Sequence, residues 1–132
     1  MLIQAGARRL DSESLAMTES KTIILPWPPK ELSPNARVHW AKKASAVKSY
    51  RKTCWIMALS HSVVRLESTI RLKVTFSPPD KRSRDLDNCI ASVKAMFDGL
   101  ADAWKVNDRQ FSVEYNMGKP LRRGEVIVEI VG

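Results

Sequence analysis

The chain has 132 residues with 44% hydrophobic and 27% charged content, which is the composition of one globular domain. It contains no apolar run of the ~18–20 residues that span a bilayer, which excludes a transmembrane protein. Lys and Arg number 22 against 14 Asp and Glu, and this net charge of +8 favours a polyanionic partner such as nucleic acid. A soluble protein that is merely basic is the alternative.

Residues 1–20 are polar, follow no sustained period and lack the apolar core of a signal peptide. They are expected to form a flexible leader, which is dispensable because it offers no apolar face to pack. Met17 precedes the first regular element, and a chain that begins there is expected to fold as well as the full one. Residues 21–132 are the single predicted domain.

The first half of the domain predicts a strand and a helix. The β-branched run Thr22–Leu25 predicts a short strand, which the sequence Pro26-Trp27-Pro28-Pro29 must end. Composition then favours a helix from about residue 40 to residue 60. Its expected apolar stripe consists of Val47, Cys54, Ala58 and the neighbouring Trp55. Its expected positive surface consists of Lys42, Lys43, Lys48, Arg51 and Lys52.

The second half predicts a strand, a helix and two further strands. Apolar residues alternate over Ile70–Phe76, which is typical of a half-buried strand. One continuous helix is then indicated by a single apolar face, made of Leu86, Ile90, Val93, Phe97, Leu100 and Trp104. Residues 111–117 and 126–130 alternate again, and the Gly118–Gly124 loop between them predicts a hairpin. The fold class is therefore α+β, with a small mixed sheet in the order β-α-β-α-β-β and two helices packed on one face.

The two cysteines, Cys54 and Cys89, are far apart in predicted helices. Together with His39 and His61 they do not have the spacing of a zinc site. We expect buried thiols in a reducing cytoplasm, which fits a cytoplasmic protein.

A pair of carboxylates, Asp85 and Asp87, stands where the chain enters the second helix. Residues two apart in an extended segment project to one side, so both carboxylates would converge while Leu86 points inward. Converging carboxylates suit a hard cation such as Mg²⁺ or Mn²⁺. The alternative is that these residues only cap the helix and complement its dipole.

Three cations, Lys81, Arg82 and Arg84, precede this pair. Cations that hold phosphates beside a metal that activates water are typical of a phosphodiester-cleaving site, although a solvated loop is equally consistent. A further carboxylate, Asp108, lies beyond the far end of this helix, whose two ends are ~24 Å apart if it spans about residues 88–103. Asp108 could therefore join the pair only through the next strand or from a second subunit. A restriction-type site at Asp80 is rejected, because no Asp/Glu-x-Lys triplet follows it.

These segments together resemble the RusA family of Holliday junction resolvases, phage- and prophage-associated endodeoxyribonucleases. The similarity covers about residues 22–130. The matching segments are Leu25-Pro26-Trp27-Pro28-Pro29, Asp85-Leu86-Asp87-Asn88, Lys94-Ala95-Met96-Phe97-Asp98-Gly99-Leu100, and Asn107-Asp108 with Gln110. The resemblance implies a small α+β homodimer in a bacterial or phage-infected cell that binds four-way DNA junctions and makes paired nicks with Mg²⁺, or with Mn²⁺ as a substitute.

By position, the resemblance implies that Asp85, Asp87 and Asp108 are metal ligands and that Lys94 is the essential lysine. Lys81, Arg82 and Arg84 are the expected DNA-binding residues. In the best-known members the lysine lies four residues after the second Asp, where this chain has Ala91; Lys94 lies one helical turn further. The acidic loop also begins with Asn107 where an Asp is typical. The alternative function is a non-catalytic, basic nucleic-acid-binding protein.

Overall fold

A computed structural model describes residues 21–61 and 69–131. The predicted leader, residues 1–20, lies outside the described residues. The fold is α+β, and the predicted order β-α-β-α-β-β is confirmed. The strands are β1 (Lys21–Pro26), β2 (Ile70–Ser77), β3 (Phe111–Met117) and β4 (Glu125–Val131). The helices are α2 (Trp40–Ala58), α3 (Leu86–Ser92) and α4 (Lys94–Trp104), with short 3₁₀ turns η1 (Lys30–Leu32) and η2 (Asp108–Gln110).

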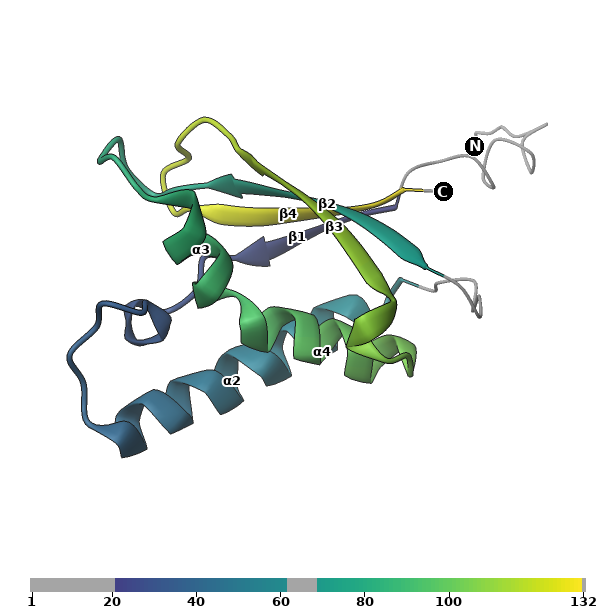
Figure 1. Ribbon diagram of the computed structural model, residues 1–132, viewed down its shortest axis with the longest axis horizontal. Coiled ribbons are helices and arrows are strands. Elements are labelled where there is room, and N and C mark those ends of the chain that lie inside the picture. The colour runs from purple at the N-terminus through teal and green to yellow at the C-terminus, as the bar shows by residue number, and fades with distance from the viewer. Residues whose placement is uncertain (1–20, 62–68, 132) are drawn as a thin grey trace, which may run out of the picture.

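The four strands form one mixed sheet, with the helices on one side of it (Figure 1). The strand order is β1-β4-β2-β3, in which β4 runs antiparallel to both neighbours and β2 runs parallel to β3. The predicted hairpin of β3 and β4 is therefore wrong, because β2 lies between them. Helices α3 and α4 form a crossover connection that places β3 parallel to β2. The loop after β3 therefore crosses the end of β2, and β4 pairs with the other edge of β2.

The helix predicted between residues 86 and 104 is also not continuous. It is interrupted at Val93, which has φ −109° and ψ 20° and separates α3 from α4. The hydroxyl of Ser92 donates to the carbonyl oxygen of Asn88 at 2.8 Å, a back-bonding contact that bends helices. Val93 is nevertheless fully buried, so both short helices keep the apolar face that the sequence predicts.

The core lies between the sheet and the helices. The four alternating apolar residues of β2, from Ile70 to Phe76, all face it and are buried, as predicted. Helix α2 contributes Tyr50, Cys54 and Ala58. The predicted stripe on α2 is thus only half right, because Val47 and Trp55 are each 37% exposed.

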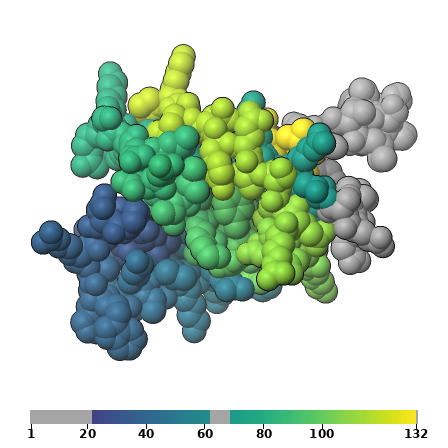
Figure 2. Space-filling view, viewed as in Figure 1, coloured from purple at the N-terminus to yellow at the C-terminus, as the bar shows by residue number. Residues whose placement is uncertain are grey.

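Hydrogen bonds made by Tyr50 and Trp104 help to fasten α2 to the rest of the domain. The hydroxyl of Tyr50 donates to the carbonyl oxygen of Pro26 at 2.7 Å. Near the other end of the helix, the indole Nε1 of Trp104 donates to the carbonyl oxygens of Ala58 and His61. The residues before Tyr50 are mostly exposed, and this part of the helix stands out at the lower left of Figure 2. No helix in the described part of the chain is long and apolar enough to cross a membrane.

Candidate active site

The two carboxylates at the start of α3 are exposed and have different local roles. Asp85 is the N-cap residue, and its Oδ1 accepts a hydrogen bond from the backbone N–H of Asp87 at 3.0 Å. Asp87 lies in the first turn of the helix, and Leu86 between them packs against the core. Because α3 already begins at Leu86, Asp87 is helical and the two residues are not an extended pair; Asp85 does cap the helix. The cap uses one oxygen of Asp85 and leaves its second oxygen open.

The loop before this pair is organised by Asp80. Its carboxylate accepts hydrogen bonds from both terminal nitrogens of Arg84, at 2.8 and 3.3 Å. It also accepts from Nε of Arg82 at 3.3 Å and from the Arg82 backbone N–H at 3.0 Å. The Arg84 guanidinium, and after it the Arg82 N–H, hold the pKa of the Asp80 carboxyl well below its ordinary value. Asp80 thus fixes the conformation of the predicted DNA-binding loop.

Arg84 is held from a second side as well. Its guanidinium lies 5.6 Å from the ring centre of Trp27, and its side chain is only 17% exposed. Of the three predicted DNA-binding cations, Lys81 and Arg82 are exposed, whereas Arg84 is engaged within the protein. Sequence reasoning missed Asp80 as the anchor, although arginines two and four residues after an Asp in a Pro-Pro loop are a usable signal.

The segment Pro26-Trp27-Pro28-Pro29 lies beside the start of α3. A small pocket of about 110 Å³ is lined by Trp27 and Pro29 on one side and by Arg84, Asp85 and Asn88 on the other. The sequence identified both segments separately, but nothing in the spacing of residues predicts that they meet.

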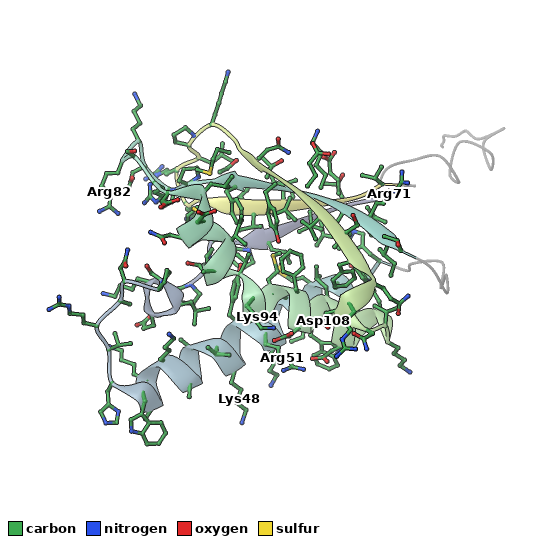
Figure 3. All side chains as sticks on the ribbon, viewed as in Figure 1. Lys48, Arg51, Arg71, Arg82, Lys94 and Asp108 are labelled. Atoms are coloured by element: carbon green, nitrogen blue, oxygen red, sulfur yellow. The ribbon has the colours of Figure 1, made fainter. Side chains whose placement is uncertain are left out.

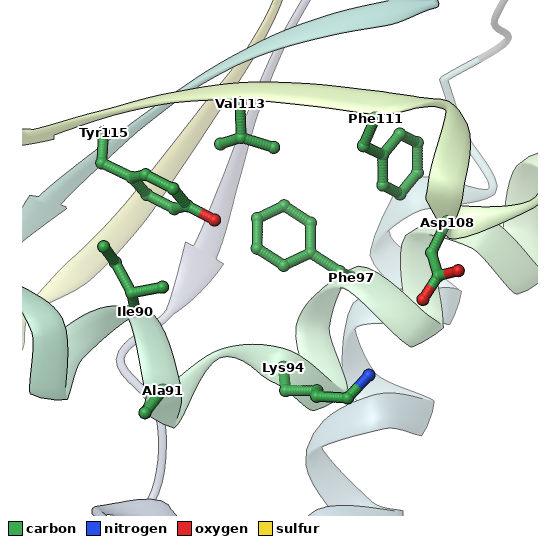
Figure 4. Close-up of a pocket in the computed structure, with 8 residues that line it drawn as sticks. All are labelled: Ile90, Ala91, Lys94, Phe97, Asp108, Phe111, Val113 and Tyr115. Atoms are coloured by element: carbon green, nitrogen blue, oxygen red, sulfur yellow. The ribbon is translucent and has the colours of Figure 1, made fainter.

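Asp108 and Lys94 line a second pocket, of about 480 Å³, between α3, α4 and β3. Its wall is apolar and includes Phe97 and Tyr115, and the two charged side chains lie at one end of it (Figure 4). A reciprocal pair of hydrogen bonds between Asn107 and η2, a capping box, holds the turn that carries Asp108. Lys94 has a 76% exposed side chain, and its Nζ lies 3.6 Å from Oδ1 of Asp98.

The predicted metal ligands do not all meet in one chain. Within residues 21–61 and 69–131, no three His, Cys, Asp or Glu side chains lie close enough together to hold one metal ion. The structure brings Asp108 back to Lys94, beside the junction of α3 and α4, while Asp85 and Asp87 remain at the other end of α3. The predicted set thus divides into a carboxylate pair and a Lys94–Asp108 pair. Ala91, which occupies the position of the lysine in the best-known members of the RusA family, also lines the second pocket.

The break at Val93 changes the expected relationship between Lys94 and Asp87. The two residues are seven positions apart, which is about two turns of a continuous helix. Lys94 instead begins a new helix, whose N-terminal turn contributes the backbone N–H groups of Met96 and Phe97 to the Val93 carbonyl oxygen. The position of Lys94 relative to Asp85 and Asp87 therefore cannot be derived from the number of residues per turn of one continuous helix.

Comparison with known proteins gives a relative for this sequence. No protein-family model matches the sequence. A protein of Xylella fastidiosa is 37% identical over 119 residues, and the match covers 86% of this chain and 78% of the relative. The two chains belong to one family. The relative is described as an uncharacterized protein, so it supplies no activity, and the function has to be argued from the chemistry of the site.

Proposed function

We propose that the protein is a Mg²⁺-dependent endonuclease that cuts four-way DNA junctions, as the resemblance to the RusA family implies. The observation that carries the proposal is the position of Asp85 and Asp87. Both are exposed at the start of α3, directly after a loop with exposed cations, so a large polyanion can reach them. Cations that hold phosphates next to metal-binding carboxylates are what phosphodiester cleavage requires.

In this proposal the carboxylate pair would hold a hydrated Mg²⁺ ion. Mg²⁺ is usually held by one or two carboxylates and keeps several waters or takes substrate phosphates as its other ligands. The cap uses Oδ1 of Asp85, so its Oδ2 and both oxygens of Asp87 remain as ligands for Mg²⁺, or for Mn²⁺ as a substitute. Asp108 can join this set only from a second copy of the chain or after a shift of η2, and its contribution is a separate part of the proposal.

The other residues bind and orient the DNA. When bound, the metal would supply a water of lowered pKa and stabilise the leaving oxygen. Lys81 and Arg82 are exposed and can contact phosphates, while Arg84 supports their loop through Asp80 and Trp27. Lys94 is exposed enough to turn from Asp98 toward a phosphate and offset its developing charge.

A homodimer is part of the same proposal. A four-way junction is close to two-fold symmetric, and an isologous dimer presents two identical sites in that symmetry. Large apolar side chains are exposed on α2, among them Trp40 (76%) and Ile56 (52%), and exposed aromatic residues are enriched at interfaces. Light scattering at micromolar concentration should give the mass of two chains; the mass of one chain would contradict the dimer.

The second candidate is a nucleic-acid-binding protein without activity. The hydrogen bond from the Asp87 N–H to Asp85 favours it, because it gives one of the two carboxylates a structural role as a helix cap. This candidate predicts binding that weakens with salt but no cleavage in Mg²⁺ or Mn²⁺.

One experiment separates the two candidates. A labelled four-way junction and a linear duplex are incubated with the protein, with and without Mg²⁺ or Mn²⁺, beside the Asp87→Asn variant. We expect metal-dependent paired nicks in the junction only, with 5′-phosphate and 3′-hydroxyl ends. The variant should bind the junction at least as well, because removing a negative charge reduces repulsion of phosphates, but it should not cut. Binding without cleavage in both metals would favour the second candidate, and full cleavage by Asp87→Asn would refute the metal site.

A further inference from the structure

The loop Gly118–Gly124 between β3 and β4 lies across the end of β2. The backbone N–H of Gly118 donates to the carbonyl oxygen of Phe76 at 2.7 Å, and that of Leu121 donates to the carbonyl oxygen of Pro78 at 2.9 Å. These bonds tie the loop to the first residues after β2, which continue into the loop that carries Asp80. Two loops that are far apart in the sequence are thereby held side by side, and they project together at the upper left of Figure 2.

The end of this loop is also packed against the proline segment. Gly124 has φ +73°, a left-handed conformation that favours glycine. A Cβ on Gly124 would lie 3.0 Å from Cδ of Pro79 and 3.0 Å from Cβ of Trp27. The end of the loop therefore lies against Trp27, the residue whose ring contacts Arg84.

The two loops carry a strong positive charge. Residues 78–84 and 118–124 contain six cationic side chains and one carboxylate, that of Asp80. Asp80 is already bonded to Arg82 and Arg84. We call the five exposed cations of these loops the cationic rim: Lys81, Arg82, Lys119, Arg122 and Arg123. Within the described chain, none of the three cations of the second loop forms an ion pair.

The rim is next to the carboxylate pair. Its first loop leads directly into Asp85, with Arg84 between the exposed Arg82 and the start of α3. We propose that Lys119, Arg122 and Arg123 bind DNA phosphates together with Lys81 and Arg82, on the strand that passes the start of α3. This inference rests on the proposed function and adds a second DNA-binding loop to it. A polyanion with regularly spaced charges suits the rim because its cations come from two loops held in fixed relation.

The test compares two variants of equal charge. The rim variant is Lys119→Gln/Arg122→Gln/Arg123→Gln, and the control is Lys48→Gln/Lys52→Gln/Arg71→Gln. Lys48 and Arg71 lie away from the rim residue Arg82 (Figure 3), and each variant removes three positive charges from an exposed surface. Junction binding is measured by fluorescence anisotropy over a range of salt concentrations in Ca²⁺, and single-turnover cleavage is measured at saturating protein in Mg²⁺.

We expect the rim variant to bind the junction about 10- to 100-fold more weakly at 0.1 M salt, with a salt dependence flattened by about 2–3 in the logarithmic slope. The control should lose less than about threefold, and the loss in the rim variant should appear in the affinity more than in the single-turnover rate. Equal losses in the two variants would overturn the rim and leave the proposed function standing. If the wild-type chain binds no DNA at all, the proposed function fails first and the rim fails with it.

Discussion

Gly99 of α4 lies directly against the backbone of Arg51 in α2. A Cβ on Gly99 would lie 2.5 Å from the Arg51 carbonyl oxygen and 3.1 Å from the backbone nitrogen of Trp55. The two helices can approach this closely only because the position has no side chain. The same contact allows the Arg51 guanidinium to reach Asp102, at 2.8 and 3.0 Å. The Phe97-Asp98-Gly99-Leu100 segment thus has a structural reason for its glycine.

We expect Gly99→Ala to destabilise the protein by about 2–3 kcal/mol, since backbone atoms would have to move apart. Urea denaturation measures this change. In an ordinary helix interior the same substitution stabilises by about 1 kcal/mol, so the sign of the effect is diagnostic. An unchanged or higher midpoint would mean that the helices are not in this contact.

The two roles of Asp85 can be separated by two substitutions. Asn caps a helix about as well as Asp, whereas Ala loses about 1 kcal/mol of cap. We therefore expect Asp85→Asn to keep the wild-type stability but not to cut the junction. Asp85→Ala should lose cleavage and also the stabilisation from the cap. Thermal melts and the junction assay give the two readouts. Wild-type cleavage by Asp85→Asn would leave only the capping role.

Asp80 should make stability depend on pH in one direction. Its pKa is lowered in the folded state, so its ion pairs stabilise the fold above the ordinary Asp pKa and are lost as pH falls toward the folded value. The stability difference between wild type and Asp80→Asn should be constant from about pH 7 to pH 5 and should shrink below about pH 4. Urea midpoints at several pH values measure it. A difference that stays the same at pH 3 would show that Asp80 is not paired in this way.

Lys94→Ala should lower the single-turnover cleavage rate by about 10²-fold, and the rate should fall more than the affinity. The control is Asp98→Asn, which removes the ion-pair partner of Lys94 but keeps the lysine. An unchanged rate in Lys94→Ala would assign the charge-stabilising role to Lys81 or Arg82.

The two free cysteines should be inert while the protein is folded. Burial raises the pKa of the Cys54 thiol to about 12, and burial also raises the pKa of Cys89. Because the thiolate is the reactive form, Ellman's reagent at pH 8 should label neither thiol in the native protein and both in urea. Rapid labelling of one thiol without urea would show that its side chain is accessible.

The periodicity of apolar residues predicts the strands of this chain well, but it does not predict which strands pair in the sheet. The alternation in Ile70–Phe76 depends on burial of one face and is correct to the residue. The same kind of alternation in β3 and β4 identifies two strands, yet the pairing of β3 with β2 depends on the crossover of α3 and α4, which leaves no local pattern. The hairpin prediction failed for that reason.

The sequence indicated which residues of the candidate site are exposed better than it indicated which segments of the chain meet there. Asp85 and Asp87 at the start of α3, and Lys81 and Arg82 in the loop before it, are exposed, as their polar sequence indicates, whereas Arg84 is engaged within the protein. The roles of Asp80 and of the loop from Gly118 to Gly124 depend on contacts between segments distant in the sequence. The helix is interrupted at Val93, next to the back-bonded hydroxyl of Ser92, and the continuous apolar stripe gives no sign of this interruption.

The position of β4 has a consequence for how the domain is made. β4 is the last strand along the chain, yet it lies between β1 and β2 and holds β1 in the sheet. During synthesis on a ribosome, β1 and β2 must therefore wait with unpaired edges until Glu125–Val131 has left the exit tunnel. Pairing Leu25 with Val126 also closes a loop of about a hundred residues, which is a slow step in folding. Until that pairing forms, the nascent chain is open to aggregation through these strand edges, and a chaperone that shields them should raise its yield.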